Sequence, residues 1–237
     1  MSGSTELSVV LPAHNEEAAI EGVIRDVVAT VRRLAPGAAE VLVIDDGSTD
    51  GTGAILDRMA GELDEVEVIH QRPNRGHGAA LLAGWERATG AWVGHLDTDD
   101  QIPADQLERL WPERDGADLV LGIRTDRDDP RHRLVVTKIL RALVHRLAGQ
   151  PIRDANVPCK LASASLLAEA LPLMPADTFA PSVSLAVVAA RRGRVIRQVP
   201  VVHRARPHGT SSLKPLRLAS ALATSTRQTV ALARSLR

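Results

Sequence analysis

The first 123 residues alternate short apolar segments with segments of helical periodicity, and this alternation constrains the fold more than any other feature. Apolar runs typical of buried strands occupy residues 7–11, 41–44, 66–69, 91–96 and 119–123. Segments that favour helices separate them, at residues 20–34, 50–59, 79–88 and 103–110. This order predicts an α/β fold with a mostly parallel central sheet and helices on both of its faces.

The second half of the chain gives weaker signals. Residues 134–147, 163–171 and 213–236 favour helices, and residues 195–202 favour a strand. Asn15 is expected to be the N-cap of the first helix, because Glu16 and Glu17 would then lie in its first turn. There is no internal repeat and no long linker, so we expect the 237 residues to form one domain.

Composition excludes several classes of protein. The formal net charge of zero argues against a uniformly basic nucleic-acid-binding protein, and an aromatic content of 2% leaves few side chains for base stacking. The single cysteine, Cys159, excludes an internal disulfide framework and a Cys-rich zinc module. We find no secretory signal and no apolar run long enough to span a bilayer, so we expect a cytoplasmic protein.

Charge is distributed unevenly along the chain. All 29 acidic residues lie within residues 1–177, whereas residues 178–237 hold 11 basic residues and no acidic residue. Such an asymmetry is typical of a segment that faces an anionic partner, here a phosphorylated ligand or an anionic membrane surface. An exposed, solvated helix face explains the same pattern equally well.

Polar residues follow three of the predicted strands, at residues 12–16, 45–52 and 97–101. Ligands of open parallel sheets bind beyond the carboxyl ends of the strands. Asn, Asp, Ser and Gly are also common turn formers, so one such cluster would carry little weight. Acidic groups that converge from neighbouring strands repel one another unless a cation or a sugar hydroxyl lies among them. The three clusters together therefore favour a ligand site.

The third cluster has the composition of a divalent metal site. Asp97, Asp99 and Gln101 are spaced by two, so in an extended segment their side chains would point the same way. Two carboxylates and an amide oxygen suit Mg²⁺ or Mn²⁺, with phosphate oxygens completing the coordination. Such a metal would neutralise a diphosphate leaving group.

Four segments carry a resemblance to a known family: Pro12–Glu16, Val43–Thr52, Asn74–Ala79 and Leu96–Gln101. They resemble family 2 glycosyltransferases, in particular the dolichol-phosphate (polyprenyl-phosphate) mannosyltransferase-like subgroup. The resemblance implies a GT-A (Rossmann-like) fold, a UDP- or GDP-sugar donor, Mg²⁺ or Mn²⁺, and inversion at the anomeric carbon. Residues 1–123 would form the nucleotide-sugar-binding half, and residues 124–237 the acceptor-binding half with a basic C-terminal helix.

The resemblance also implies roles for single residues of the donor site. The nucleotide pocket would be lined by Pro12, Ala13, Asn15 and Glu16, with Asp46 against the nucleoside. Arg75, Gly76 and Arg206 would lie near the donor. Asp97, Asp99 and Gln101 match the metal-binding pattern of the subgroup, with Asp99 also counted as catalytic.

The second half matches the subgroup more loosely. Arg124 ends a Gly-x-Arg segment like that after the fifth strand of the subgroup, and we count it as catalytic. Arg133 and Thr137 resemble the pair that binds the acceptor phosphate, and residues four apart share a helix face. An ordinary exposed basic helix start explains them as well. Asp154 is the downstream acid we nominate as a general base, with pairing to an arginine as the alternative.

These observations predict an enzyme that transfers a sugar from a nucleotide donor to a polyprenyl phosphate or another phosphate-bearing acceptor. A phosphate acceptor is already ionised at neutral pH and needs no dedicated base. The alternative is transfer to a hydroxyl of a small molecule or a cell-envelope glycan, including natural-product synthesis. A dinucleotide-binding oxidoreductase and an inactive nucleotide-binding module are weaker candidates. We expect the basic C-terminal helix to permit peripheral membrane contact, and the histidines other than His14 and His208 to be packing or surface residues.

Overall fold

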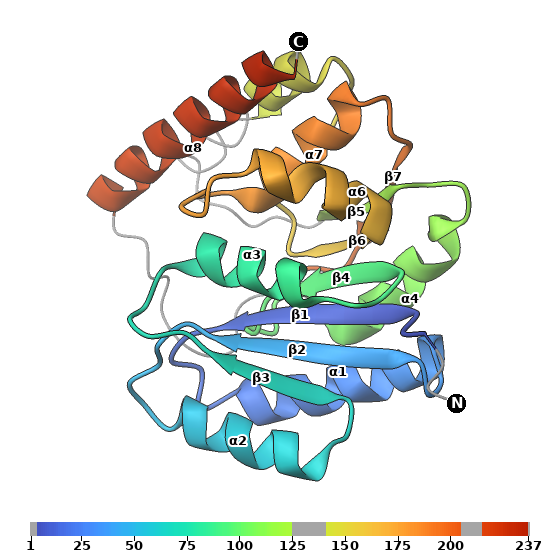
Figure 1. Cartoon of the computed structure of the whole chain (residues 1–237), viewed down its shortest axis with the longest axis vertical. Helices are drawn as coiled ribbons and strands as arrows, with labels where there is room; N and C mark the ends of the chain where they lie inside the picture. Colours follow the sequence, from blue (N-terminus) through green and yellow to red (C-terminus); the bar gives the residue numbers. More distant parts are fainter. Residues whose placement is uncertain (1–3, 125–140, 205–214, 237) are drawn as a thin grey trace.

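One seven-stranded sheet organises the protein (Figure 1). The computed structural model describes residues 4–124, 141–204 and 215–236. The strands are β1 (Leu7–Ala13), β2 (Ala39–Asp45), β3 (Val66–His70), β4 (Trp92–Leu96), β5 (Leu119–Arg124), β6 (Cys159–Ser163) and β7 (Ile196–Val201). Their order across the sheet is β3-β2-β1-β4-β6-β5-β7, so strands from both halves of the chain share one sheet.

The sheet is mostly parallel, as the alternation of strands and helices predicts. β1 pairs in parallel with β2 and β4, β2 with β3, and β5 with β7. The exception is β6, which runs antiparallel between β4 and β5. We did not predict β6, because it is short and carries a lysine at its second position, which interrupts the apolar pattern.

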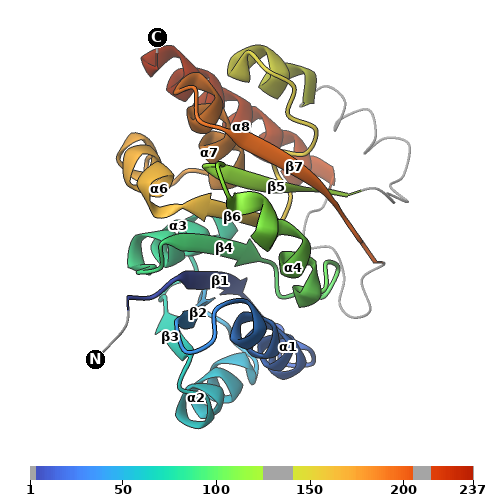
Figure 2. The same cartoon turned by 90° about the vertical axis from the view of Figure 1, so that its right-hand side faces the viewer.

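Helices cover both faces of the sheet (Figure 2). They are α1 (Ile20–Leu34), α2 (Thr52–Glu62), α3 (His77–Arg87), α4 (Leu107–Leu110), α6 (Ala164–Ala170), α7 (Pro181–Arg191) and α8 (Pro215–Ser235), and residues 141–148 are also helical. Figure 2 shows α1, α2 and α4 on one face, with α3, α6 and α7 on the other. Short 3₁₀ turns flank α4 and follow α6, at Ala104–Gln106, Trp111–Arg114 and Leu171–Leu173.

The prediction that Asn15 caps the first helix is wrong. Helix α1 begins at Ile20, after a turn, and its N-cap residue is Ala19. Asn15 instead adopts a left-handed backbone conformation with φ of 55°, which asparagine tolerates better than most residues. Its side-chain oxygen accepts a hydrogen bond from the backbone N–H of Thr49 at 2.8 Å, so it ties the turn after β1 to the turn after β2.

Helix α7 was also missed. Eight of its eleven residues are buried, so apolar residues surround the helix and leave no amphipathic periodicity to detect. It packs between α3 and α8, and Gly78 of α3 lies so close to the carbonyl oxygen of Thr178 that a Cβ atom would overlap it. This close approach fixes the amino-terminal end of α3 against the second half of the chain.

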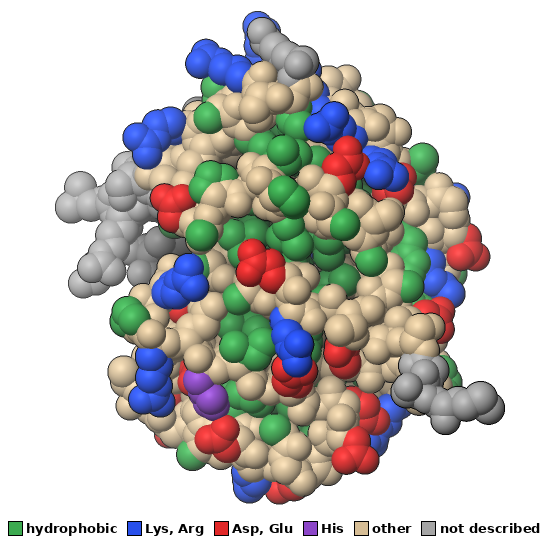
Figure 3. Space-filling model, viewed as in Figure 1, with side chains coloured by type: hydrophobic (Ala, Val, Ile, Leu, Met, Phe, Trp, Pro, Cys, Tyr) green, Lys and Arg blue, Asp and Glu red, His purple; other side chains and the backbone are tan. Residues whose placement is uncertain are grey.

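Charged side chains are not uniform over the surface. In Figure 3 the upper end of the molecule, where α8 lies, shows mainly Lys and Arg, whereas Asp and Glu are mixed with them lower down. Among the described residues, no helix has the length and apolar character needed to cross a membrane.

Candidate functional site

A cavity of about 250 Å³ opens at the carboxyl ends of β1, β2 and β4. Because these strands are parallel neighbours, the residues that follow them meet at one edge of the sheet. The cavity is lined by Pro12, Ala13, His14, Glu16, Asp46, Asn74, Gly76, His77, Ala80, Asp97, Thr98 and Asp99. All three polar clusters of the sequence thus contribute to one wall.

Asp46 organises the turn that forms one side of the cavity. Its two carboxylate oxygens accept hydrogen bonds from the backbone N–H groups of Arg75 and Gly76, at 2.7 and 2.8 Å. Asn74 donates from its side chain to the carbonyl oxygen of Asp46 at 2.7 Å. Gly47 follows with φ of 69°, and a Cβ atom there would lie 2.9 Å from the nitrogen of Asn74. The segment around Asn74 therefore packs closely against the residues that follow β2.

The acidic cluster after β4 has a different backbone from the one we assumed. Residues 97–101 form a turn rather than an extended segment, and Asp100 has a left-handed φ of 55°. Asp97 and Asp99 nevertheless both line the cavity. Gln101 lies outside the cavity wall, where its backbone N–H donates to Asp99 Oδ1 at 3.1 Å and its side-chain nitrogen to the carbonyl oxygen of Arg204 at 3.4 Å.

The donor set fits a hard divalent cation. Two carboxylates, Asp97 and Asp99, line the cavity. The side-chain nitrogen of Gln101 donates a hydrogen bond to the carbonyl oxygen of Arg204, which leaves the side-chain oxygen of Gln101 to act as an acceptor or ligand. Oxygen ligands of this kind suit Mg²⁺ and Mn²⁺. Arg204 belongs to the segment after β7, so the far edge of the sheet also reaches this corner.

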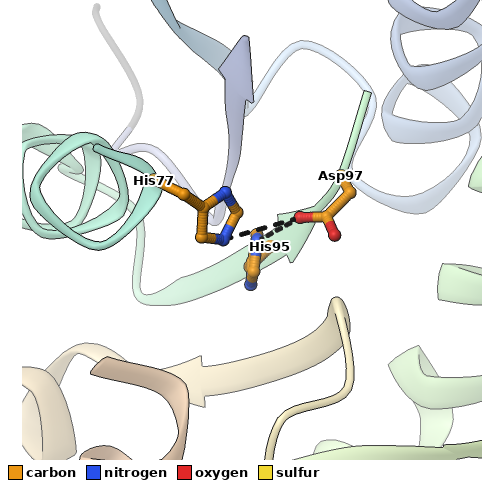
Figure 4. Close-up of side chains that lie close together, drawn as sticks. All are labelled: His77, His95 and Asp97. Carbon is orange, nitrogen blue, oxygen red and sulfur yellow. Dashed lines mark hydrogen bonds and ion pairs between the residues drawn. The ribbon is translucent and has the colours of Figure 1, made fainter. Parts of the chain in front are cut away.

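Two histidines converge on Asp97 (Figure 4). His95 Nε2 lies 3.1 Å from Asp97 Oδ1, and His77 Nε2 lies 3.8 Å from the same oxygen. His95 is buried, and burial lowers its pKa to about 4, so the ring is neutral and Nε2–H donates to the carboxylate. Burial raises the pKa of Asp97, but His77 and His95 outweigh it and hold that pKa well below its usual range. Asp97 is therefore ionised.

This cluster was missed at the sequence level. We expected His77 and His95 to be packing or surface residues, yet they and Asp97 offer three ligand atoms within 4.8 Å of one another. Nitrogen ligands beside a carboxylate also suit transition metals. The only signal in the sequence is positional, because His95 lies two residues before Asp97.

Lys160 lies behind this cluster in the middle of the sheet. It is only 1% exposed, and within the described part of the chain its Nζ has no hydrogen-bond partner. Burial lowers its pKa from 10.5 to about 7, although Asp97 and Asp154 oppose that shift. Its neighbour Cys159 is also buried, and burial raises the pKa of that thiol to about 12, so the thiol is unreactive.

Arg124 and Asp154 form a buried ion pair at the same edge. The guanidinium donates to both carboxylate oxygens, at 2.7 and 3.0 Å, and the two side chains are only 15% and 8% exposed. A bidentate pair of this kind satisfies the carboxylate and fixes its orientation. The alternative interpretation of Asp154, as the partner of an arginine, therefore agrees with the geometry better than a free general base does.

The structure brings together most of the residues proposed for the donor site. Of those residues, seven line the cavity: Pro12, Ala13, Glu16, Asp46, Gly76, Asp97 and Asp99. Asn15, Arg75 and Gln101 are within two positions of lining residues in the sequence, but they do not line the cavity themselves. Arg133, Thr137, Arg206 and His208 lie outside the described residues.

The fold and the site together define an α/β protein with a mostly parallel sheet and an acidic, metal-compatible corner at the strand ends. The model of the family described as glycosyl transferase family 2 matches residues 8–170. The chain therefore belongs to glycosyl transferase family 2.

Curated relatives show which members of this family the chain resembles. The chain is 31% identical over 215 residues to the undecaprenyl-phosphate 4-deoxy-4-formamido-L-arabinose transferase of Pseudomonas fluorescens. The match covers 90% of this chain and 61% of that protein. The transferase of the same name from Salmonella enteritidis is also 31% identical, with 90% of this chain and 64% of that protein covered. The chain thus spans about three fifths of the length of these relatives, which are polyprenyl-phosphate glycosyltransferases of family 2.

Solved structures confirm the expected GT-A fold. Glucosyl-3-phosphoglycerate synthase from Mycobacterium tuberculosis, in complex with Mn²⁺, uridine diphosphate and phosphoglyceric acid, matches with a TM-score of 0.65 and 27% identity. That match covers 99% of this chain and 78% of the synthase. Mannosyl-3-phosphoglycerate synthase from Rubrobacter xylanophilus has the same fold, with a TM-score of 0.67 at 18% identity over 98% of this chain and 74% of its own.

Lys160 gives the stability of the protein a pH dependence. Its pKa of about 7 in the folded state lies below the ordinary value of 10.5, so between these values the unfolded chain binds more protons. The contribution of Lys160 to the free energy of unfolding therefore rises with pH across this window. Below this pH window Lys160 is protonated in the folded and in the unfolded chain, and the buried ammonium then destabilises the folded state to the full extent.

We expect Lys160→Met to be more stable than the wild type near pH 6, with the advantage shrinking toward pH 9, because methionine removes the buried charge. Urea denaturation across this range measures the difference. A difference that does not change with pH contradicts the burial-driven shift.

Proposed function

We propose that this protein transfers a sugar from a nucleotide-sugar to a phosphate-bearing acceptor, with inversion at the anomeric carbon. The observation that carries the proposal is the meeting of three polar strand ends in one cavity, with Asp97 and Asp99 in its wall. Membership of glycosyl transferase family 2 supports it. A divalent cation, Mg²⁺ or Mn²⁺, would supply Lewis-acid assistance by neutralising the diphosphate leaving group.

The donor would enter at the ends of β1 and β2. Pro12, Ala13, Asn15 and Glu16 would hold the nucleotide, and Asp46 would contact the nucleoside while it anchors the turn at Arg75 and Gly76. Asp97, Asp99 and Gln101 would hold the cation, and Arg206 would reach the diphosphate. Support comes from the Mycobacterium tuberculosis synthase, whose structure contains Mn²⁺ and uridine diphosphate.

The acceptor would approach from the second half of the chain. Arg133 and Thr137 would bind its phosphate, and Arg124 would lie beside the reacting groups. An ionised phosphate oxygen attacks without a general base, and the pairing of Asp154 with Arg124 is consistent with a reaction that needs none. The curated relatives, which are named as undecaprenyl-phosphate transferases, favour a polyprenyl phosphate.

A second candidate is transfer to a hydroxyl of a small phosphorylated acid. It is favoured by the 27% identity to glucosyl-3-phosphoglycerate synthase over almost the whole chain. The two candidates yield different bonds, because a lipid phosphate gives a glycosyl phosphate and a hydroxyl gives an O-glycoside, which is an acetal. Mild acid hydrolysis of the product distinguishes them, since glycosyl phosphates are the more labile.

Asp99→Asn is expected to fold normally and to lose metal-dependent donor binding. Removal of one anionic ligand weakens cation binding, and loss of even an outer-shell partner costs about 10- to 100-fold. Calorimetry with UDP-, GDP- and dTDP-sugars, with and without Mn²⁺, measures the effect and also identifies the base. Asp100→Asn in the same turn is the matched control. Equal Mn²⁺-dependent binding by wild type and Asp99→Asn would remove Asp99 from the metal site.

Arg133→Ala is expected to spare donor binding and to raise the KM for a phosphorylated acceptor by about tenfold or more, the effect of losing one charge-assisted hydrogen bond. Initial rates with undecaprenyl phosphate and with 3-phosphoglycerate provide the measurement. An unchanged KM for the acceptor that is used refutes the assignment of Arg133.

We also propose peripheral contact with an anionic membrane surface through the basic end of the chain. Arg227 and Arg234 are exposed and seven residues apart, so they lie two turns apart on one side of α8. The variant Arg227→Glu/Arg234→Glu is expected to float with anionic vesicles less than the wild type does at low salt, because each basic residue near such a surface contributes about 1 kcal/mol. Neutral vesicles are the control, and equal flotation by both proteins argues against this surface.

A further inference from the structure

His70, the last residue of β3, lies between two carboxylates. Its Nδ1 lies 2.8 Å from Asp45 Oδ2 at the end of β2, and its Nε2 lies 2.9 Å from Asp57 Oδ1 on α2. A neutral imidazole has one N–H, so its other nitrogen would place a lone pair against an anionic oxygen. A doubly protonated ring donates to both carboxylates. The geometry therefore favours the imidazolium form of His70.

Within the described part of the chain, Asp45 and Asp57 are the charged groups that contact His70 from the elements packed against β3. Hydrogen bonds with Asp57 and Asp45 raise the pKa of His70, and burial opposes them only in part. The other charged residues of β2, β3 and α2 have partners elsewhere: Glu40 with Ser8 and Thr89, Glu67 with Arg87, Arg58 with Glu21 and Glu62, and Glu62 with Arg25.

Asp45 is a buried carboxylate whose side chain is only 1% exposed. Burial raises the pKa of this carboxyl group, but hydrogen bonds from Ser48 and His70 outweigh that effect and hold the pKa below its usual range. Asp45 is therefore ionised at neutral pH. A buried anion that loses its cationic partner destabilises its surroundings. The loss of a proton from His70 would leave Asp45 in that state.

Asp45 connects His70 to the wall of the cavity. Its Oδ1 accepts a hydrogen bond from the backbone N–H of Ser48 at 2.9 Å. The hydroxyl oxygen of Ser48 in turn accepts one from the backbone N–H of Asn15 at 3.0 Å. Asp46, which lines the cavity, lies within the same turn. The direction of the Asp45 carboxylate thus helps to fix this part of the wall.

Asp57 connects His70 to helix α2, which packs against β2 and β3 (Figure 1). The helix begins at Thr52, whose hydroxyl oxygen accepts a hydrogen bond from the backbone N–H of Glu16 at 2.9 Å. Glu16 also lines the cavity. One imidazole ring therefore joins two elements that each hold a different lining residue in place.

We propose that His70 is a positioning residue for the nucleotide donor: as an imidazolium between Asp45 and Asp57, it holds the turn after β2 and the start of α2 in the arrangement that binds the nucleotide. The inference rests on the proposed function, because it concerns the donor site. His70 itself lies outside the cavity wall. Nucleotide binding and protonation of His70 then favour each other, and by linkage each strengthens the other by the same factor.

The direction of the pH dependence follows from the raised pKa. Because this pKa lies above the ordinary value of 6.5, His70 keeps its proton at the ordinary value and loses it as the pH rises through the raised pKa. Its side chain is 31% exposed, so the proton exchanges with solvent. The contribution of His70 to nucleotide affinity is therefore complete at and below pH 6.5 and is lost at higher pH.

UDP binding to the full chain tests this proposal without any need for turnover. Calorimetry with Mn²⁺ measures the affinity from about pH 6 to about pH 9, and nuclear magnetic resonance of the ring Cε1–H signals measures the pKa of His70. Because His14 and His77 also line the cavity, variants assign the pH dependence to one ring. His70→Gln removes the charge, and His70→Arg keeps a charge with several donors.

Two exposed acids provide a matched pair of variants. Asp57→Asn removes one partner of His70 at a side chain that is 70% exposed. Asp64→Asn removes an exposed acid just beyond α2 and is the control for net charge. Asp57→Asn is expected to lower the pKa of His70 and to move the fall in UDP affinity to lower pH by the same amount. Asp64→Asn is expected to change neither.

We expect His70→Gln to bind UDP about tenfold more weakly than the wild type near pH 6, the effect of losing one charge-assisted hydrogen bond, with a smaller loss at higher pH. His70→Arg is expected to restore binding across the whole range. Circular dichroism checks that each variant folds. If His70→Gln does not fold, the comparison of Asp57→Asn with Asp64→Asn replaces it.

The outcomes separate the two levels of the argument. Equal UDP affinity of the wild type, His70→Gln and Asp57→Asn at every pH overturns the role of His70 and leaves the proposed function intact. A loss in His70→Gln that is the same at every pH, without rescue by His70→Arg, indicates packing alone and also overturns it. A pKa of His70 at or below its ordinary value does the same. No UDP binding by the wild type, even with Mn²⁺, overturns the proposed function and this inference together.

Discussion

The parallel pairing of β1 with both β2 and β4 is the constraint on which the site depends. Parallel strands end at the same edge of a sheet, so their carboxyl ends deliver three polar turns to one place. The turns are then held by specific contacts: Asn15 with Thr49, and Asp46 with the N–H groups of Arg75 and Gly76. The backbone, rather than long flexible side chains, sets the shape of the cavity.

Electrostatics explain why this edge tolerates so many acids. Asp46 is held by backbone donors, Asp154 by Arg124, and Asp97 by His95 and its buried neighbours. Each of these three carboxylates thus accepts hydrogen bonds from the protein itself. Such an arrangement fixes the direction of the carboxylates, and a preorganised set of polar groups favours recognition of a charged ligand.

Much of this could be predicted from the sequence, because the relevant signals are local. The strands of the first half, and the polar residues after them, follow from apolar runs that end in turn formers. Asp97 and Asp99 lie at the cavity as expected, although the turn at Asp100 was not foreseen. Asn15 was misassigned because a residue that caps a helix and one that adopts a left-handed turn have the same sequence signature.

The rest required information that no local pattern contains. His95 and Lys160 are 65 positions apart in the chain, and only the register between β4 and β6 makes them neighbours. Helix α3 contributes to the burial of His95, since Trp85 packs edge-on against the His95 ring. Eight of the eleven residues of helix α7 are buried, so its sequence lacks the amphipathic periodicity that marks surface helices.

The reversed direction of β6 has a consequence for how such a protein can change. Because β6 runs opposite to β4, with Leu96 beside Cys159, the residues that enter β6 lie at the edge where the other strands exit. A connecting segment of the second half therefore reaches the first half's binding corner without adding a strand. Substitutions or insertions in this segment, near Asp154, can change the surroundings of that corner while the pairing of the strands stays unaltered.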